Sequence, residues 1–399
     1  MDFFHEKNHD LLVYRPPSTY HIDGILQHVT GAKQINGSYV AVPRTLRNSQ
    51  VLRWLNYPVP QIVTDENYDW PIEPGRKPWE SQRVTTNFMV LHPRSFVLSD
   101  MGVGKTIATL WAADWLMRQH APGTFRALVV APLSILERVW ANAIFTNFLS
   151  SRRFEILHGD ADKRSAALAR EADFYIVNFD GVGVGAHTNK KLELDGFSAL
   201  LANRNDIRLA IVDEASSYKD AQTKRHRIAR LVFGKKDYLW LLTGTPTPNA
   251  PTDAYGLAKM INNAQGKSFR AFQEETMHKI SQFRWVPRKD GYDKARALLT
   301  PSIRYDIKDV WDGPEMTTQQ REVALTPDQK KYLGDLKRDL QVVVKSGHQI
   351  TAINEAASPA YLADTFWILR AKSYVADVDA KPSQEKFLLG WMHRLINGL

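Results

Sequence analysis

Between Ser95 and about Ile261, short apolar runs alternate with stretches in which apolar residues recur every three or four positions. This alternation is typical of strands and helices that follow one another in a parallel sheet. Two helical stretches are expected, Ile107–Arg118 and Ser134–Leu149, the second with Ser134 as its N-cap. The predicted strands are Phe96–Leu98, Ala127–Val130, Phe154–Leu157, Phe174–Val177, Leu209–Val212 and Tyr238–Leu242. We therefore expect an α/β fold, a parallel sheet with helices on both faces.

The sequence on either side of this region has a different pattern. Residues 1–78 are rich in Pro, Tyr and Trp and contain two β-type runs, Ser38–Val42 and Gln61–Thr64, which predict a small β-rich module. After Ile261 the chain is more charged, with a polar helical pattern at Pro327–Val344 and an amphipathic one at Pro382–Ile396. We place the domain boundaries at 1–78, 79–265 and 266–399.

Composition narrows the function classes. The 399 residues are 44% hydrophobic and carry a formal net charge of +9, which favours a globular protein with a polyanionic partner. The absence of cysteine excludes a disulfide framework, a thiol nucleophile and cysteine-ligated zinc. No run approaches the roughly 20 apolar residues that span a membrane, so we expect a cytoplasmic protein with no membrane partner.

A candidate phosphate loop follows the first predicted strand of the sheet. A glycine-containing loop that opens a helix points backbone N–H groups at a phosphate, and the helix N-terminus adds partial positive charge. Lys105 is expected to reach the β- and γ-phosphates, and Thr106 to place its hydroxyl on Mg²⁺. Ser99 replaces the first glycine of the strict pattern. The loop residues expected to bind the nucleotide are Asp100, Met101, Gly102, Val103, Gly104, Lys105 and Thr106.

Two further polar segments follow strands of the same sheet. Asp213 and Glu214 come directly after Leu209–Val212, and a buried strand end with two carboxylates is unfavourable unless a cation is near. Asp213 is expected to hold Mg²⁺ through water, and Glu214 to orient and deprotonate the attacking water, unless the two are simply solvated carboxylates at a strand end. Thr243–Asn249 follows the last predicted strand. Because parallel strands share one carboxyl edge, these segments and Lys105 are expected to meet around one nucleotide.

These blocks, in this order and spacing, resemble the motifs of superfamily two helicases, and most closely those of Swi/Snf-type DNA translocases, including bacterial and phage forms. Their counterparts are motif I at Asp100–Thr106, motif Ia at Ala131–Ser134 with Trp140, motif Ib at Asn178–Asp180, motif II at Asp213–Ser216 and motif III at Thr243–Asn249. Ser216 and Pro248 stand where many relatives have histidine and glutamine. The resemblance covers about residues 75–265 and implies that 79–265 is the first RecA-like, ATP-binding P-loop lobe.

The resemblance also implies roles for residues that the pattern alone leaves open. Gln82, upstream of the loop, is expected to read adenine, since an amide pairs with both N6 and N7. Trp79 adds either a stacking ring or ordinary packing. Expected contacts to the DNA backbone, without sequence reading, come from Pro132, Leu133, Ser134 and Asn178. Thr243, Gly244 and Thr245 are expected to couple nucleotide to DNA.

A basic run lies between motifs II and III. Seven Lys or Arg, against Asp220 and Asp237, fit a solvated helix face and phosphate binding equally well. Within it, His226–Arg230 looks superficially like the arginine-bearing motif VI, but that motif belongs on a second lobe. We therefore expect a structural or DNA-facing role there. The basic residues are Lys219, Lys224, Arg225, Arg227, Arg230, Lys235 and Lys236.

The resemblance implies a second RecA-like lobe, in the same or another chain, that no segment here matches. Glu315–Tyr332 and Lys381–Leu399 look like segments that lead toward it, so a fragment is expected over a split motor or a protein that has lost its motor. Such a chain should hydrolyse ATP poorly, because an absent arginine finger is worth roughly 10³–10⁵ in rate. Two alternatives stay open, a non-motor nucleic-acid-binding protein with a structural or vestigial ATP site, and a helicase-type restriction subunit. The resemblance implies a nucleoid-associated protein of a bacterial or phage-infected cell.

Overall fold

The structure is a computed structural model that describes residues 4–6, 10–148, 151–188, 192–281, 284–310, 341–343 and 349–351. The chain divides into two compact units, Met1–Gly313 and Pro314–Leu399. Among the residues described, no helix is long and apolar enough to cross a membrane.

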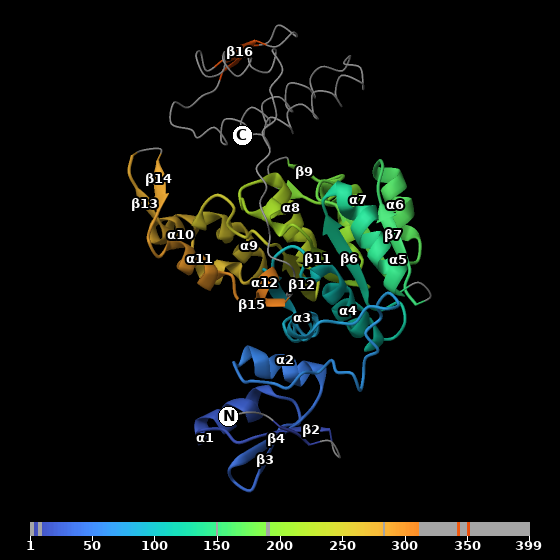
Figure 1. Cartoon of the computed structure of the whole chain (residues 1–399), viewed down its shortest axis with the longest axis vertical. Coiled ribbons are helices and arrows are strands. Elements are labelled where there is room, and N and C mark those ends of the chain that lie inside the picture. The colour runs from blue at the N-terminus through green and yellow to red at the C-terminus, as the bar shows by residue number, and fades with distance from the viewer. Residues whose placement is uncertain are drawn as a thin grey trace. The chain divides into compact units, whose positions relative to one another are not determined.

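A seven-stranded sheet lies at the centre of the first unit, in the order β15-β5-β12-β11-β6-β8-β7 (Figure 1). Every neighbouring pair in it is parallel. Its strands are β5 (Arg94–Val97), β6 (Arg126–Ala131), β7 (Phe154–Leu157), β8 (Phe174–Asn178), β11 (Ile207–Val212), β12 (Tyr238–Leu242) and β15 (Ser302–Ile303). The six strands predicted from the sequence are confirmed. β15, a two-residue edge strand, was not predicted.

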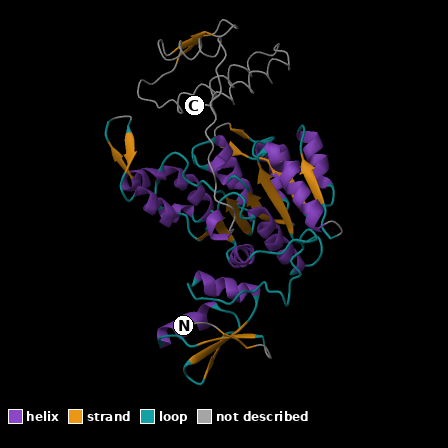
Figure 2. Ribbon diagram, viewed as in Figure 1, coloured by secondary structure: helices purple, strands orange, loops and turns teal. Residues whose placement is uncertain are grey.

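Helices cover both faces of this sheet, as Figure 2 shows in purple against the orange strands. Side chains alternate along β6, so that Leu128 and Val130 join one buried cluster while Ala127 and Val129 join the other. The first face packs against α6 (Ala161–Ala169), α7 (Gly196–Asn203), α8 (Lys224–Phe233) and α9 (Ala254–Ile261). The second packs against α3 (Glu80–Leu91), α4 (Lys105–Arg118) and α5 (Asn142–Phe148). The predicted α/β fold is confirmed.

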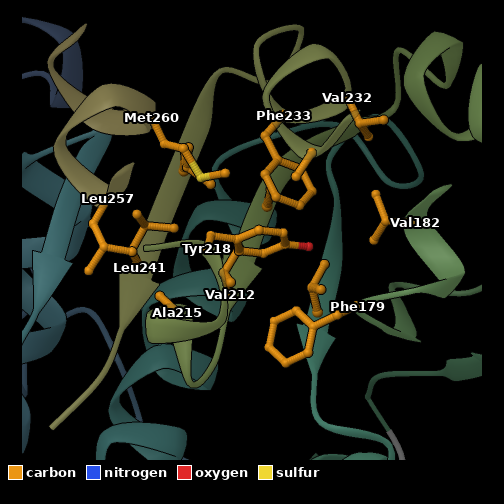
Figure 3. Close-up of a cluster of buried hydrophobic side chains, with 14 of the residues drawn as sticks. Phe179, Val182, Val212, Ala215, Tyr218, Val232, Phe233, Leu241, Leu257 and Met260 are labelled. Atoms are coloured by element: carbon orange, nitrogen blue, oxygen red, sulfur yellow. The ribbon is translucent and has the colours of Figure 1, made fainter. Parts of the chain in front are cut away.

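The first cluster holds a buried tyrosine near the middle of the sheet. Figure 3 shows Tyr218 among the side chains of Phe179, Val182, Val232 and Phe233. The Tyr218 hydroxyl is fully buried and finds no hydrogen-bond partner in the described part of the chain. Such an unsatisfied group is uncommon in a protein interior.

The helix predicted at Ser134–Leu149 is broken into three parts. A 3₁₀ turn, η1 (Leu133–Ile135), is followed by a π-helical turn, η2 (Leu136–Ala141), before α5 begins. Ser134 therefore lies inside the first turn, and its predicted N-cap role is wrong. The buried residues Leu136, Trp140 and Ile144 are spaced by four, which a wider π turn keeps on one side of the segment.

The N-terminal region forms a four-stranded antiparallel sheet with two helices. The strand order is β1-β2-β4-β3, and the run predicted at Ser38–Val42 is confirmed as β4. Leu12, Ile25, Val40 and Leu52 are fully buried between the sheet and the helices. The elements are β1 (Phe4–Glu6), β2 (Leu11–Tyr14), α1 (Thr19–His28), β3 (Lys33–Ile35), β4 (Tyr39–Pro43) and α2 (Leu46–Trp54).

The strand predicted at Gln61–Thr64 is wrong, because a side chain takes the hydrogen bonds that a strand would use. The Asn87 Oδ1 atom accepts the N–H groups of Ile62 and Val63, each at 2.8 Å. The Asn87 Nδ2 atom donates to the Val63 carbonyl at 2.9 Å. The segment is thus fixed to α3 rather than to a neighbouring strand.

The remaining elements follow the sheet or lie between its strands. Longer ones are α10 (Phe269–Thr276), β13 (Met277–Lys279), β14 (Trp285–Pro287), α11 (Gly291–Leu298) and α12 (Ile307–Val310). Short ones are η3 (Gly181–Gly183), β9 (His187–Thr188), β10 (Leu192–Glu193), η4 (Ala215–Tyr218), η5 (Pro251–Asp253) and η6 (Asn263–Gly266). The domain boundaries placed at residues 78 and 265 stay predictions.

The second unit is described at two strands, β16 (Gln341–Val343) and β17 (Gln349–Thr351), which pair antiparallel. The helix predicted at Pro327–Val344 is therefore wrong at 341–343, where consecutive valines favour a strand. The rest of that prediction, the helix at Pro382–Ile396 and the segments Glu315–Tyr332 and Lys381–Leu399 lie outside the described residues.

Candidate active site at the carboxyl edge of the sheet

Three neighbouring strands end together at one edge of the sheet. β12 lies between β5 and β11, with Leu242 opposite Val97 and Leu241 opposite Val212. The loops that follow these strands carry Lys105, Thr243 and Asp213. These three segments therefore leave the sheet side by side, as the sequence predicts.

The loop Asp100–Thr106 curls around its own lysine. Gly102 and Gly104 have φ values of +86° and +80°, a region that favours glycine. A Cβ at Gly104 would also collide with the side-chain amide of Gln82. The Lys105 Nζ atom donates to the carbonyls of Ser99 at 2.8 Å and Asp100 at 2.7 Å. Within the loop, Val103 is buried and Met101 is 76% exposed.

Electrostatics link this lysine to the carboxylates after β11. Burial lowers the pKa of Lys105, and the charges of Asp213, Glu214 and Asp100 oppose that shift. Burial raises the pKa of Glu214, with a further contribution from Asp213 and an opposing one from Lys105. The three groups thus act on one another across the loops.

Asp213 is almost fully buried and is held by two donors. Its Oδ2 atom accepts the indole N–H of Trp140 at 2.9 Å, and its Oδ1 atom accepts the Glu214 N–H at 3.0 Å. Burial raises the pKa of Asp213, and the donors Trp140 and Glu214, together with Lys105, hold the rise in check. Glu214 itself has φ +50° and ψ +50°, a left-handed conformation that is unusual for a non-glycine residue and is typical of functional sites.

The hydrogen bond from Trp140 could not be predicted from the sequence. Trp140 lies 73 residues before Asp213, in the π-helical turn that the helical pattern does not reveal. Its indole ring is fully buried on the second face of the sheet. The bond holds the Asp213 carboxylate in one orientation at the strand end.

A cleft of about 770 Å³ opens beside the loop. Its lining includes Gly102, Gly104 and Thr106 of the loop together with Trp79 and Gln82 from the start of α3. The Gln82 Oε1 atom accepts the Trp79 N–H at 3.0 Å, at the start of α3. An amide carbonyl has a second lone pair, so this bond leaves acceptor capacity as well as the Nε2 donors.

The segment after β12 touches the phosphate loop. The Thr243 N–H donates to the Val97 carbonyl at 3.0 Å, and the Thr243 hydroxyl accepts the Thr245 N–H at 3.1 Å. A Cβ at Gly244 would lie 3.5 Å from the Ser99 carbonyl oxygen. Thr243 is buried and Thr245 is exposed, so the turn runs from the sheet interior to the surface.

A distant segment also holds the phosphate loop, and the sequence gives no signal for it. Tyr305, which follows β15, donates its N–H to the Ser99 hydroxyl at 3.0 Å and accepts the Asp100 N–H at 2.9 Å. The Ile307 N–H lies 3.4 Å from the Asp100 Oδ2 atom. The start of the loop is therefore fixed by residues more than 200 positions later in the chain.

The residues expected at the DNA backbone lie at the ends of β6 and β8. Ala131 is opposite Asn178, so Pro132 and Asn178 leave the sheet from neighbouring strands. Leu133 is 57% exposed in the η1 turn that also contains Ser134. The Asn178 Oδ1 atom accepts a guanidinium N–H of Arg164 at 3.3 Å. These residues form a group at the same edge of the sheet as Asp213, because β6 and β8 are the next strands after β11.

The basic run between motifs II and III separates into different environments. Lys236 is buried and its Nζ atom donates to the carbonyls of Leu201, Ala202 and Arg204, at the end of α7. Arg225 pairs with Asp180. Arg227 and Arg230 are exposed on α8. The residue pattern alone could not distinguish these environments.

Comparison with known proteins identifies the family. The SNF2-related domain matches residues 76–360, more than half of the chain. Similar proteins include p41 of Acyrthosiphon pisum secondary endosymbiont phage 1, at 28% identity over 50% of this chain and 42% of p41. An ATP-dependent helicase of Schizosaccharomyces pombe is 24% identical over 62% of this chain and 25% of its own length. CHROMATIN REMODELING 5 of Arabidopsis thaliana is 28% identical over 73% of this chain and 17% of its own length.

The chain spans less than half the length of each of these relatives. Among solved structures, it is similar to the Sulfolobus solfataricus SWI2/SNF2 ATPase core in complex with dsDNA, with a TM-score of 0.45 and 21% identity over 67% of this chain and 53% of that one. The family match implies ATP as a ligand of the protein. The chain belongs to the SNF2-related family of helicase-like, Swi/Snf-type ATPases.

Proposed function

We propose that this chain is the first lobe of an ATP-dependent DNA translocase of the Swi/Snf type, a motor that hydrolyses ATP on double-stranded or branched DNA. One observation carries the proposal. The ammonium group of Lys105 and the carboxylates of Asp213 and Glu214 lie close enough to perturb one another at the carboxyl edge of the sheet. A phosphate loop and a carboxylate pair are the parts that ATP hydrolysis requires of this lobe.

The residues around the loop suit ATP. The positive φ angles at Gly102 and Gly104 leave room for phosphates to approach the backbone, and α4 begins at Lys105, so its N-terminus faces them. Lys105 exchanges its carbonyl partners for phosphate oxygens on binding. Gln82, at the adjoining cleft, pairs with the N6 and N7 atoms of adenine.

The donor set also suits magnesium. Proteins hold Mg²⁺ by one or two carboxylates together with substrate phosphates and water, and Thr106 with Asp213 provides a hydroxyl and a carboxylate. When bound, the ion neutralises charge on the phosphates. Glu214 orients the attacking water and accepts its proton, a task helped because burial raises the pKa of this carboxylate and so makes it a stronger base.

The DNA would lie against the ends of β6 and β8. Pro132, Leu133 and Ser134, with Asn178, offer backbone amides, a hydroxyl and a side-chain amide to phosphates, which positions a protein without reading sequence. Gly244 lies against the start of the phosphate loop, and Thr243, Gly244 and Thr245 would couple the nucleotide to movement. A second RecA-like lobe, in the same or another chain, supplies the arginine finger.

The test is ATP binding by this chain, and ATP turnover with and without double-stranded DNA by the chain together with its second lobe, since the first lobe alone should hydrolyse ATP poorly. Lys105→Ala should abolish tight ATP binding, whereas Glu214→Gln should keep binding and lower turnover on the order of 10²–10⁴-fold. Lys294→Ala, on α11, is the matched control for loss of a lysine. ATP binding that survives Lys105→Ala, with DNA binding unaffected by ATP, would refute the motor and leave a DNA-binding protein on this fold.

A further inference from the structure

A groove of about 940 Å³ lies on the first face of the sheet, away from the phosphate loop. The exposed side of α8 forms one wall, with Arg227, Arg230 and Leu231. Lys259 of α9 and Phe269 of α10 line it as well. Its volume is at the upper end of the roughly 300–1,000 Å³ typical of ligand clefts.

The charges of this groove are unbalanced. Of its two carboxylates, Asp253 pairs with Lys219 at 3.6 Å, whereas Asp220 accepts the uncharged Gln222 N–H at 2.8 Å and keeps its negative charge. In contrast, the charged groups of Arg227, Arg230 and Lys259 make no hydrogen bond or ion pair within the described ranges. These three cations therefore outnumber Asp220, whose charge is not paired with a cation in the described part of the chain, and the groove keeps an excess of positive charge.

A buried histidine of the lining joins two helices of the groove. His226, which is buried, donates its Nε2 proton to the Gly256 carbonyl at 2.9 Å and so joins α8 to α9. Burial lowers the pKa of His226, and the charges of Arg230 and Lys259 lower it further, while the hydrogen bond to Gly256 and the charge of Asp220 oppose the shift. The two walls are thus held together, and the groove is formed before any ligand enters.

The groove also contains exposed apolar side chains, which contacts to a nucleic-acid backbone do not require. Leu231 is 43% exposed and Phe269 is 38% exposed. The Phe269 ring packs edge-on against Tyr255, with ring centroids 5.3 Å apart, which makes a firm aromatic wall. The Leu231 and Phe269 side chains line the same groove as the cations, so that a partner entering it would meet apolar and charged groups together.

We propose that this groove binds an acidic peptide segment of a partner protein, one that carries a bulky apolar side chain between its carboxylates. Arg227, Arg230 and Lys259 pair with the carboxylates, as arginine clusters do in acidic-motif recognition. Leu231 and Phe269 receive the apolar side chain. A DNA backbone would satisfy the cations and leave both apolar side chains without a partner, so the peptide fits the whole lining better.

The test uses a short fluorescent peptide in which Glu and Asp flank a Phe-Leu pair, with binding followed by fluorescence anisotropy. We expect saturable binding that weakens as salt rises. The double variant Arg227→Glu/Arg230→Glu should weaken it by about tenfold or more, since like charges would then face each other. Leu231→Ser/Phe269→Ser should weaken it as well. Lys224→Glu, on the same helix but outside the groove, is the matched control and should bind as the wild type does.

Three results would overturn the proposal. The first is a peptide affinity that survives both double variants. The second is equal binding of a peptide whose Phe-Leu pair is replaced by Ser-Ser, which would indicate general polyanion binding. The third is a pair of findings, that the peptide does not bind the wild type and that Arg227→Glu/Arg230→Glu loses affinity for a DNA duplex. Together they would assign the groove to nucleic acid. Thermal unfolding of each variant separates these results from misfolding.

Discussion

The hydrogen bond from Trp140 to Asp213 should set the acid limit of activity. In Trp140→Phe the ring stays apolar and the indole N–H is lost, so that among the described residues the buried Asp213 carboxylate keeps one donor, the Glu214 N–H. Burial already raises the pKa of Asp213 above its usual range, and the indole opposes that rise. Its removal favours the protonated carboxyl group, which cannot act as a ligand for a cation.

The size of the effect follows from the strength of such a bond. A hydrogen bond to a charged group contributes about 1.5–3 kcal/mol, and one pKa unit corresponds to about 1.4 kcal/mol. The acid limb of the pH–activity profile should therefore move up by roughly one to two pH units. Because Asp213 and Glu214 interact, this limb belongs to the pair rather than to either residue.

The assay is the pH dependence of kcat/KM for ATP turnover, which reports groups of the free enzyme, with ATP–Mg affinity followed over the same range. Trp111→Phe is the matched control, since Trp111 is also fully buried on that face and donates to the Pro71 carbonyl at 2.6 Å, away from the site. An acid limb that does not move in Trp140→Phe, or that moves equally in both variants, would refute the reasoning.

Three other substitutions test the physical arguments above. Gly104→Ala should abolish ATP binding, because it adds both backbone strain and a collision with Gln82. The control Gly37→Ala, at φ +70° with open space around it, should lower stability and leave ATP binding unchanged. Equal ATP affinities of the two variants in calorimetry would contradict this. Tyr218→Phe should raise the free energy of unfolding in urea by about 1 kcal/mol, as it removes a buried hydroxyl with no partner in the described residues, and a fall would reveal a hidden partner. Lys236→Met should destabilise the fold by roughly 1–3 kcal/mol, whereas Lys235→Met should change it by less than about 0.5 kcal/mol. Burial lowers the pKa of Lys236 to about 8, so the folded state loses that proton at a lower pH than the unfolded state. The wild type therefore gains stability between about pH 8 and 10, and the difference in unfolding free energy between it and Lys236→Met should widen over that range. A difference that stays constant would contradict the shifted pKa.

The sheet could be predicted because its strands carry a strong local signal. Runs such as Leu209–Val212 and Tyr238–Leu242 are buried on both faces, which leaves continuous apolar residues in the sequence. The position of the site follows from the same signal, since parallel strands share a carboxyl edge. The predicted roles of Lys105, Asp213 and Gln82 stay predictions, although the structure brings their segments together.

The features that could not be predicted depend on partners far away in the chain. The segment Gln61–Thr64 has the residues of a strand, yet the Asn87 amide binds its backbone. β15 has too few residues for a periodic pattern, and it forms by pairing in parallel with β5. Trp140 and Tyr305 reach the site across 73 and 206 positions. In each case the decisive contact is tertiary, and no local spacing encodes it.

The electrostatics of the site explain why it should respond strongly to its ligand. Burial raises the pKa of Asp213 and Glu214 and lowers that of Lys105, so each charged form is less stable here than in water. The left-handed backbone at Glu214 adds strain of about 1–3 kcal/mol. A ligand that brings both a divalent cation and phosphates offers a counter-charge to all three groups at once, whereas a nucleotide without the cation adds negative charge beside two carboxylates. Thermal stabilisation by ATP should therefore depend steeply on Mg²⁺, and that dependence should vanish in Asp213→Ala while the wild type keeps it.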